Sequence, residues 1–338
     1  MKLLISSLNE SKNLLTGFDT DTQEIFWELP RPFGDVTVLP FTPCGISYVR
    51  GHLVAAGFSH LWCWGKDSWD TSLGHHKAMA HSVGSVGDRL VVVDSGKSCL
   101  QVRKWGGDFE GTMPALDAIE LHHQQVHDAY HLNDFCETPH GLLASCFTAK
   151  PKRDDSPWRN RQERMSGLIL SMDEDSRVVY CGLDCPHSLT YLEAEPGEAG
   201  VLLVLANDHL VQLTWDEHVQ HYQAMASQHV SATHFVRGMV ANRNEILMGG
   251  SVTRKDSESL AAMQNEATLG PVIYRIRLGE VEGDAASSQV EEMLLWEGPG
   301  EIYDLLPWDD EIMWEASRAL EQAGHISSPS FTEMESRL

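Results

Sequence analysis

The most regular pattern of hydrophobic and polar positions in the chain runs from His131 to Ala149. A short apolar segment with polar residues at its head is followed by a turn at Thr138–Gly141 and then by a second apolar segment. Short apolar runs that are separated by turn residues are typical of paired β-strands. The pattern therefore predicts an all-β fold built from hairpins of this kind.

The same pattern occurs in six copies when they are aligned on the first apolar residue after the turn. The copies begin at Cys44, His81, His131, His187, Arg237 and Tyr303, and the one at His187 fits if its turn is lengthened. Each copy, with the strands after it, is about as long as a four-stranded propeller blade, roughly 40 to 50 residues. The sequence therefore predicts a six-bladed β-propeller, with a β-sandwich as the competing all-β interpretation.

The two ends of the chain complement each other. The last copy is followed by too few residues to complete a blade, whereas KLLISSL, NLLTGFD and EIFWELP near the start read as three short strands. A ring of blades must hide its sheet edges, so we expect residues 1–30 and 302–312 to form one shared blade. The propeller then spans 1–313, and 314–338 are expected to form a helix followed by a mobile polar tail.

Polar residues stand at the head of each predicted innermost strand. The first ring position holds Cys44, His81, Asn133, His187, Arg237 and Tyr303, and the second holds Gly45, Ser82, Asp134, Ser188, Gly238 and Asp304. The residues on either side are mostly apolar, so these polar groups are expected to be buried, where an unpaired group costs about 1–3 kcal/mol. Because the innermost strands surround a channel, the polar groups should converge near one mouth.

The ring supports two interpretations. As a catalytic site it would use His81 or His187 as general base, because imidazole titrates near neutrality, and Arg237 to hold an anionic group. The other candidate catalytic residues are Asp134, Asp304 and Tyr303, and the candidate ligand contacts are Cys44, Ser82 and Ser188. Alternatively, the channel is filled with water, and Asp134 and Asp304 tie adjacent blades through backbone N–H groups. Three histidines outside this register, His131, His140 and His234, are expected to be structural.

Two insertions interrupt the blades, at Lys150–Met165 and Thr253–Gly270. Both fall between the second and third strands, whose connections lie on the face where the innermost strands begin, so both insertions should overhang the mouth. The first is the most basic stretch of the chain and contains Trp158, Arg159 and Arg161. These residues are expected to attract an anionic ligand and contact it.

The charge of the chain limits its partners. Lys and Arg total 25 against 49 Asp and Glu, a formal net charge of −24. This acidity argues against nucleic acid and against an anionic membrane as partners. The chain lacks an apolar stretch of membrane-spanning length and a secretory segment, and its seven cysteines include no Cys-x-x-Cys pair. We therefore expect a cytoplasmic protein with reduced thiols that binds a small molecule, with a protein partner as a further option.

The segments HLNDFCETPHGLLASCF, PHSLTYL and GEIYDLLPWDDEIM resemble an uncharacterised bacterial family of conserved hypothetical six-bladed propeller proteins. The predicted fold is also similar to the strictosidine synthase and gluconolactonase propellers. In gluconolactonases, acidic and amide residues hold a divalent cation in the channel, which Asn133, Asp134 and Asp304 would match. The imidazoles of His81 and His187 depart from that pattern, because they suit transition metals better than calcium. The candidate metal ligands are therefore His81, His187, Asn133 and Asp134, and the candidate cofactor is a divalent transition metal.

Two functions from different classes remain open. The first is an enzyme that acts on a small polar or anionic metabolite at the channel mouth, by hydrolysis, lyase chemistry or isomerisation. The second is a non-catalytic binding module or assembly scaffold, because a propeller fold does not specify a function. The sequence contains neither a GxSxG nucleophile elbow nor a Walker loop, which disfavours serine hydrolases and nucleotide-phosphate enzymes.

Overall fold

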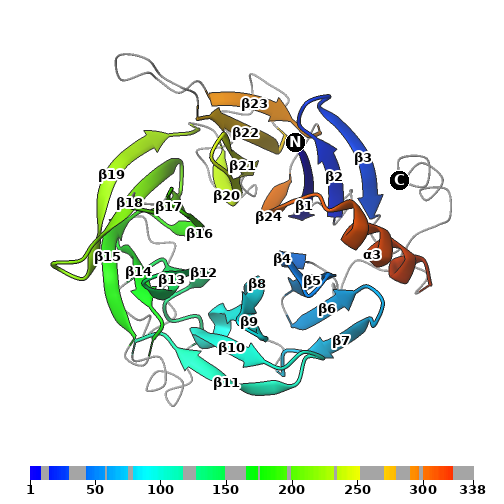
Figure 1. Cartoon of the computed structure of the whole chain (residues 1–338), viewed down its shortest axis with the longest axis horizontal. Coiled ribbons are helices and arrows are strands. Elements are labelled where there is room, and N and C mark those ends of the chain that lie inside the picture. Colours follow the sequence, from blue (N-terminus) through cyan, green and yellow to red (C-terminus); the bar gives the residue numbers. More distant parts are fainter. Residues whose placement is uncertain are drawn as a thin grey trace.

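The computed structural model describes residues 1–8, 15–29, 43–57, 59–74, 79–116, 127–148, 165–173, 176–195, 199–231, 234–251, 270–278, 290–296 and 300–322. Six four-stranded antiparallel sheets surround a central axis, as Figure 1 shows. Each sheet uses strands that are consecutive in sequence, except the one that joins the two ends of the chain. The six-bladed β-propeller predicted from the repeat is therefore confirmed.

Each blade runs outward from an innermost strand that borders the central axis. The shared blade contains β24 (Glu301–Pro307), β1 (Lys2–Leu8), β2 (Leu15–Asp19) and β3 (Glu24–Leu29). The next two contain β4 (Pro43–Val49), β5 (His52–Gly57), β6 (His60–Trp64) and β7 (Trp69–Ser72), then β8 (Ala80–Val86), β9 (Arg89–Asp94), β10 (Cys99–Arg103) and β11 (Phe109–Pro114), with the 3-10 turn η1 (Ser95–Lys97) after β9. The fourth contains β12 (Leu132–Thr138), β13 (Gly141–Cys146), β14 (Gly167–Ser171) and β15 (Arg177–Leu183). The last two contain β16 (Pro186–Leu192), β17 (Val201–Ala206), β18 (His209–Asp216) and β19 (His221–His229), then β20 (Phe235–Ala241), β21 (Glu245–Ser251), β22 (Val272–Arg277) and β23 (Val290–Leu294).

The shared blade closes the ring as expected. β24 pairs with β1 in an antiparallel register in which Leu305 faces Ile5 and Asp304 faces Ser6. The C-terminal segment thus supplies the innermost strand, and the N-terminal segment supplies the three outer strands. The two ends of the chain therefore complete one sheet, which closes the ring.

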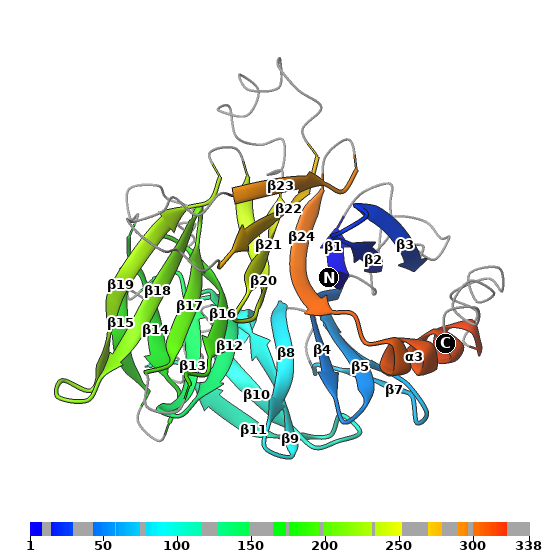
Figure 2. The same cartoon turned by 45° about the horizontal axis from the view of Figure 1, so that its top comes forward.

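The segment after β24 differs from the expectation. The strand ends at Pro307, and a helix, α3 (Asp310–Gln322), begins three residues later, so residues 310–312, which were expected in the shared blade, belong to the helix. The Asp309 carboxylate accepts a hydrogen bond from the Ile312 backbone N–H at 2.9 Å, which satisfies a free donor of the first helical turn. Figure 2 shows α3 beside the blade of β4 to β7, where Met313 is buried against an apolar cluster that includes Trp64.

Apolar side chains fill the spaces between adjacent blades. Leu143 and Ile169 of the fourth blade pack with Leu202 and Val204 of the fifth in one buried cluster. Successive side chains of a strand point to opposite faces, so each sheet can present apolar residues to both neighbouring blades. All seven cysteines lie within the described residues, and none of them forms a disulfide bond.

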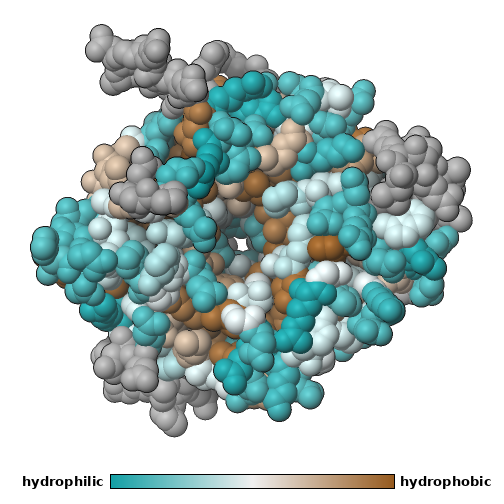
Figure 3. All heavy atoms as spheres, in the orientation of Figure 1, coloured by the Kyte–Doolittle hydropathy of each residue, from teal (hydrophilic) through white to brown (hydrophobic). Residues whose placement is uncertain are grey.

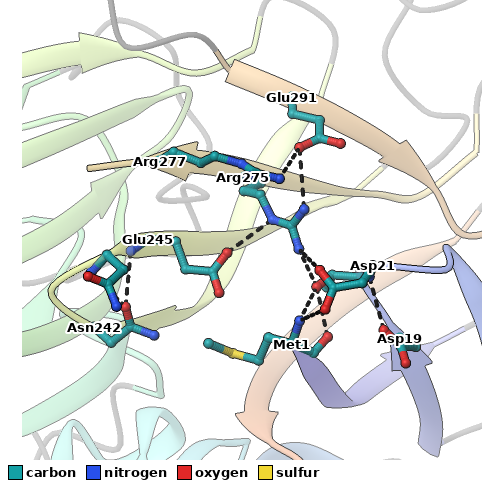
Figure 4. Close-up of polar contacts among 10 residues, drawn as sticks. Met1, Asp19, Asp21, Asn242, Glu245, Arg275, Arg277 and Glu291 are labelled. Carbon is teal, nitrogen blue, oxygen red and sulfur yellow. Dashed lines mark hydrogen bonds and ion pairs between the residues drawn. The ribbon is translucent and has the colours of Figure 1, made fainter. Parts of the chain in front are cut away.

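A charged cluster joins the last blade to the shared blade (Figure 4). The Arg275 side chain on β22 is 3% exposed, and its guanidinium lies 3.0 Å from the carboxylate of Glu245 and 3.4 Å from that of Glu291. The same guanidinium reaches the Asp21 carboxylate, just after β2, at 3.2 Å. A buried charge is tolerated only when it has such partners, so this cluster fixes the two closing blades against each other.

Candidate functional site

The head of every innermost strand contains a β-bulge. Pairing shifts register in all six strands at the predicted ring positions. The strand register skips one residue in five of these strands, and two in β8. The skipped residues are Cys44 in β4, His81 and Ser82 in β8, Asn133 in β12, His187 in β16, Gly238 in β20 and Tyr303 in β24. Consecutive residues of a regular strand face opposite sides, whereas a bulge re-aims them. The bulges therefore let adjacent ring residues turn toward the same space.

That space is a small cavity at the mouth of the channel, here called the mouth cavity, of about 20 Å³. It is lined by His81, Ser82, Asn133, Asp134, His187, Ser188, Arg237, Tyr303 and Asp304. Cys44 is completely buried and is not among these lining residues. The structure thus brings residues of five innermost strands to one place, and Figure 3 shows the opening at the centre of the ring.

A second, larger cavity of about 310 Å³ lies farther along the channel. Ser82, Asp134, Ser188 and Asp304 line both cavities, and the remaining lining residues come from later positions of the innermost strands, including Phe135, Glu137 and Leu305. The four shared side chains therefore form a constriction between the two cavities.

These constriction residues tie adjacent blades together. One Asp304 oxygen accepts a hydrogen bond from the Ile46 N–H at 3.0 Å, and one Asp134 oxygen accepts from the Leu189 N–H at 2.8 Å. The Ser188 hydroxyl accepts in the same way from the Gly238 N–H at 2.9 Å. The contacts of Asp134 and Asp304 therefore fit the structural role considered above, in which these side chains tie adjacent blades through backbone N–H groups.

In β4 and β20 the second ring position is a glycine, so no side chain at that position hydrogen-bonds to the next blade. A Cβ on Gly45 would lie 2.5 Å from the Cα of Ser82, and a Cβ on Gly238 would lie 2.9 Å from the Cα of Asp304. Gly238 also has a φ of 67°, which favours glycine. At these two positions the backbones of neighbouring blades approach too closely for any other residue.

Burial changes the ionisation of both aspartates. It raises the pKa of Asp134 to about 6, although hydrogen bonds from Ser82 and from two backbone N–H groups lower it. Burial, and next the repulsion from Asp134, raises the pKa of Asp304 to about 8. The two carboxyl groups therefore oppose each other's ionisation across the constriction.

This gives a prediction for the pH dependence of stability. Between about pH 4 and pH 8 the folded protein retains a proton on Asp304 that the unfolded chain has lost, so its free energy of unfolding falls as pH rises. Each extra proton bound by the folded state contributes about 1.4 kcal/mol per pH unit. Urea unfolding across this range should show that the free energy of unfolding decreases less with rising pH in Asp304→Asn than in the wild type. Equal slopes in the two proteins would show that Asp304 ionises in the folded state as it does in the unfolded chain.

The remaining lining residues keep polar atoms without hydrogen-bond partners among the described residues. These atoms are Nε2 of His81, Nε2 of His187, Oδ1 of Asn133 and Nε of Arg237. The His187 Nδ1–H donates to the Cys185 carbonyl at 2.7 Å, which leaves its Nε2 as an acceptor. The Asn133 amide donates to the His131 carbonyl at 3.0 Å, which leaves its Oδ1 as an acceptor too. Asn133 and His187 are only 4% and 7% exposed, so such unpaired atoms require a ligand or water.

Both ring imidazoles are held neutral. Burial, and next the Arg237 charge, lowers the pKa of His187 well below 6.5. Burial also lowers the pKa of His81 well below 6.5, with further contributions from His131 and Arg237. A neutral imidazole can accept a proton, so both residues are in the form that a general base requires.

Aromatic rings surround the guanidinium and the imidazoles. The Arg237 guanidinium lies 4.9 Å from the ring centre of Phe235 and 5.2 Å from that of Tyr303, in cation–π contact with both. His187 packs edge-on against Phe235 at 4.4 Å and is 4.7 Å from Phe147. These rings therefore fix the plane of the His187 imidazole and of the guanidinium.

Two residues beside the mouth cavity were not among the predicted ring residues. His131, which was expected to be structural, does not line the mouth cavity, but its ring lies 5.0 Å from that of His81, and its Nδ1 is 2.9 Å from the Asp128 carboxylate. His131 has a φ of 52°, so it does not follow the alternation of the strand, and register could not reveal where it lies. Glu301, one residue before β24's buried Ile302, lies 3.7 Å from Arg237 and partly balances its charge.

The donor set does not fit a metal cation. Both oxygens of Asp134 already accept backbone hydrogen bonds, and the charged Arg237 lines the same cavity. Within the described ranges, no group of three or more His, Cys, Asp or Glu side chains is arranged to hold a metal ion. A guanidinium with two neutral imidazoles and an amide suits a small polar or anionic ligand better.

The basic insertion lies outside the described residues, and so do Trp158, Arg159 and Arg161. Most of the second insertion and the tail beyond residue 322 also lie outside them. The strand connections that carry both insertions are those predicted, between β13 and β14 and between β21 and β22. The N–H of Phe147, just after β13, donates to the Tyr130 carbonyl just before β12, so this connection leaves β13 on the face where β12 begins.

Solved structures share this architecture at low sequence identity. A protein of unknown function from Bacteroides caccae has a TM-score of 0.55 at 12% identity, over 90% of this chain and 97% of its own. A functionally unknown protein from Desulfotomaculum acetoxidans has a TM-score of 0.52 at 9% identity, over 91% of this chain and 99% of its own. Virginiamycin B lyase from Staphylococcus aureus reaches 0.49 at 8% identity, over 86% of this chain and 84% of its own, which is too distant to bear on activity.

Other comparisons add no family. No protein-family model matches the chain, and no curated protein matches its sequence. The helix that the structure describes lacks the length and apolar character needed to cross a membrane. The comparisons therefore establish the fold alone, and this chain is similar in architecture to proteins whose own functions are unknown.

Proposed function

We propose that the protein is an enzyme that hydrolyses a small anionic metabolite at the mouth of the propeller channel. The observation that carries this proposal is the set of four unpaired polar atoms, on His81, Asn133, His187 and Arg237, beside the mouth cavity. Hydrolysis requires a water molecule held next to a base, and a cation is needed to bind the anionic substrate. The mouth cavity offers groups for all of these tasks.

The mouth cavity is the size of a water site. A cavity needs about 10–15 Å³ to hold the centre of one water molecule, together with two to four polar partners. A water here would accept a hydrogen bond from the Arg237 Nε–H and donate to Asn133 Oδ1 and His187 Nε2. These three contacts would satisfy three of the four unpaired atoms and would place the water on a base.

His187 is the best placed base. Its Nδ1–H is fixed on the Cys185 carbonyl, so Nε2 is the nitrogen that can take a proton from the water. The water oxygen then attacks the electrophilic carbon or phosphorus of the substrate, and its second proton remains on the product. The imidazolium that forms on His187 is stabilised by the negative charge that develops on the substrate.

Arg237 provides the recognition of the anion. Its guanidinium is planar and always charged, and two flanking rings hold it in place, so it can bind a carboxylate or phosphate oxygen with little loss of side-chain freedom. The small mouth cavity excludes large groups, so the bulk of the substrate would remain above it. The basic insertion with Trp158, Arg159 and Arg161 remains a proposed cover for that part.

A non-catalytic binding module is the second candidate. It is favoured by the engagement of Asp134, Ser188 and Asp304 in ties between blades, which leaves few groups for chemistry. In that case Arg237 and Asn133 would bind an anion that is never turned over. The two functions share their ligand and differ only in whether a bond is broken.

An isotope experiment separates these functions. The protein is incubated in water enriched in 18O with a panel of small esters, lactones, amides and phosphomonoesters that carry a carboxylate or phosphate, and products are analysed by mass spectrometry. We expect one 18O atom in the product of at least one compound. Substrate consumption without 18O would indicate lyase or isomerase chemistry, and no turnover would support the binding module.

Anion binding is tested separately by thermal unfolding with acetate, malonate, inorganic phosphate or sulfate. The wild-type midpoint should rise with at least one of these anions, and Arg237→Met should abolish the rise. Arg243→Met is the matched control, because Arg243 is 59% exposed and pairs with Glu195 away from the mouth cavity. An equal response of both variants would remove Arg237 from the site.

A further inference from the structure

Two arginines are buried in the part of the chain that the structure describes, and their partners differ. Arg275 is 2% exposed and forms ion pairs with the carboxylates of Asp21, Glu245 and Glu291. Arg103, on β10, is 3% exposed, and no carboxylate of a described residue forms an ion pair with it. A buried charge normally has a partner of opposite charge, so Arg103 lacks a counter-charge that Arg275 has.

Neutral acceptors hold the Arg103 side chain in place. Its Nε–H and one Nη2–H donate to Oε1 of Gln101 at 3.1 and 2.8 Å, and one Nη1–H donates to the Gly107 carbonyl at 2.7 Å. A guanidinium has five N–H donors, so one on Nη1 and one on Nη2 remain without a partner among the described residues.

The nearest carboxylate in this network is one residue removed from the guanidinium. The Gln101 Nε2–H donates to the Asp94 carboxylate, so the Gln101 amide separates Asp94 from Arg103. Burial lowers the pKa of Arg103, although the Asp94 charge raises it. Asp94 therefore balances only part of the cost of burying this charge.

Arg103 lines a cavity of about 350 Å³ at the outer rim of the ring, here called the rim pocket. The rim pocket lies between the blade of β4 to β7 and the blade of β8 to β11, whose outer strands are neighbours in Figure 1. A Cβ on Gly107 would lie 2.6 Å from the Thr71 side chain, so the turn before β11 packs directly on β7. The volume is in the range of small-molecule sites, about 300–1,000 Å³. No residue that lines the rim pocket also lines the mouth cavity.

The lining of the rim pocket suits an anion. Lys97 and Arg103 line it together with the hydroxyl residues Thr71 and Ser72, and the exposed Asp108 is its single carboxylate among the described residues. The described lining thus has one more positive than negative charge, in a chain whose formal net charge is −24. A phosphate monoester carries a charge of about −1.5 to −2 at pH 7 and three acceptor oxygens, which matches two cations and two hydroxyl groups.

Phe109 adds an apolar face to the rim pocket. Its side chain is 56% exposed, and the Arg103 guanidinium lies 5.9 Å from the centre of its ring. An apolar group on the ligand that covers this ring would remove apolar surface from water on both sides of the contact. The pocket therefore suits an anion that carries an organic group better than a bare inorganic anion.

We propose that the rim pocket binds a small phosphate monoester with an apolar or aromatic group. The phosphate lies on Arg103 and Lys97 and supplies the counter-charge that Arg103 lacks, and the organic group covers Phe109. The ligand is bound there without any bond being made or broken. Because the rim pocket and the mouth cavity share no residue, this inference does not depend on the hydrolysis proposed above.

Isothermal titration calorimetry of the full chain tests the proposal, with Arg237→Met as the background so that the mouth cavity does not contribute. Phenyl phosphate should bind at one site per chain, whereas inorganic phosphate and phenol at the same concentrations should give no saturable binding. Lys97→Met in this background should weaken phenyl phosphate binding about 10- to 100-fold, the usual effect of losing a charge-assisted contact. The matched control is Lys104→Met, because Lys104 is exposed and does not line the rim pocket.

Two exposed positions test the two parts of the ligand without disturbing the core. Asp108→Asn removes the opposing charge and should strengthen phenyl phosphate binding about two- to fivefold. Phe109→Ala should weaken it about tenfold, because the organic group loses its contact. The proposal is wrong if phenyl phosphate does not bind, if inorganic phosphate binds as tightly, or if Lys97→Met and Lys104→Met have equal effects. Binding of phenyl phosphate by a protein that turns over no compound would refute the hydrolase proposal and leave the rim pocket in place.

Discussion

Replacement of His187 by Gln is expected to lower kcat for the hydrolysed substrate by about 10²- to 10⁴-fold, the usual contribution of a general base. Glutamine can still donate to the Cys185 carbonyl, but it has no nitrogen that takes a proton from water. The KM should change little, because Arg237 still binds the anionic group. Steady-state kinetics on the compound that incorporates 18O measures both constants.

The matched control for this substitution is His140→Gln. His140 is partly exposed, stacks on Trp215 at 4.7 Å and is not among the residues that line the mouth cavity. This control should retain wild-type kcat. A His187→Gln enzyme with wild-type kcat would exclude His187 as the base, and His81 would then be the remaining ring imidazole.

The pH dependence of kcat/KM provides a second test of His187 as the general base. Burial and the Arg237 charge lower the pKa of His187 well below 6.5, so the base remains unprotonated, and kcat/KM should stay level as pH falls through 6.5. Arg237→Met removes one cause of that lowering, so the acidic limb of its profile should move to higher pH. This shift in pH is separate from the weaker binding of the anionic substrate that the same substitution is expected to cause.

The fold could be predicted because its signals are local. The alternation in HLNDFCETPHGLLASC and its turn at Thr138–Gly141 recur wherever a blade begins, and each copy requires only near neighbours to form its hairpin. Closure of the ring could be predicted for a similar reason. The copy that begins at Tyr303 has too few residues after it to complete a blade, and the first residues of the chain supply the missing strands. The start of α3 could not be predicted, because the helix depends on Asp309 as a cap and on burial of Met313 against another blade.

The convergence of the ring residues was predictable from the alignment, but the contacts of each residue were not. Alignment placed Asn133 and Asp134 side by side at the strand head, but it could not show that Asp134 binds the Leu189 N–H while Asn133 keeps an unpaired oxygen. That division depends on the β-bulge and on a residue of the next blade, which are both long-range properties. His131 falls outside the shared register because its left-handed backbone breaks the strand pattern.

Deletion of residues 1–30 is expected to abolish cooperative unfolding of the whole propeller. The deletion removes every partner of β24 in its own sheet, so the innermost strand that carries Tyr303 and Asp304 loses its hydrogen-bonded ladder. It also removes seven side chains that are at most 4% exposed: Leu3, Leu4, Ile5, Leu15, Phe18, Trp27 and Leu29. At about 1.5–3 kcal/mol for each, their burial contributes on the order of 10–20 kcal/mol, as much as the whole stability of a typical domain, about 5–15 kcal/mol.

Calorimetry and urea unfolding of the truncated chain measure this effect directly. The matched control is a circular permutant that begins at Pro43 and carries the N-terminal strands after Gln322 on a flexible glycine–serine linker. The permutant contains the same closing blade with a different connection, so its cooperative transition should return, whereas the truncated chain should show none. Because Asp304 also ties β24 to β4 through the Ile46 N–H, loss of the closing strands should loosen the mouth cavity, and the anion-dependent rise in thermal midpoint should disappear with them. A truncated chain that unfolds as cooperatively as the intact one, with its anion response preserved, would show that β24 is held by its neighbouring blades and that the shared blade does not stabilise the ring.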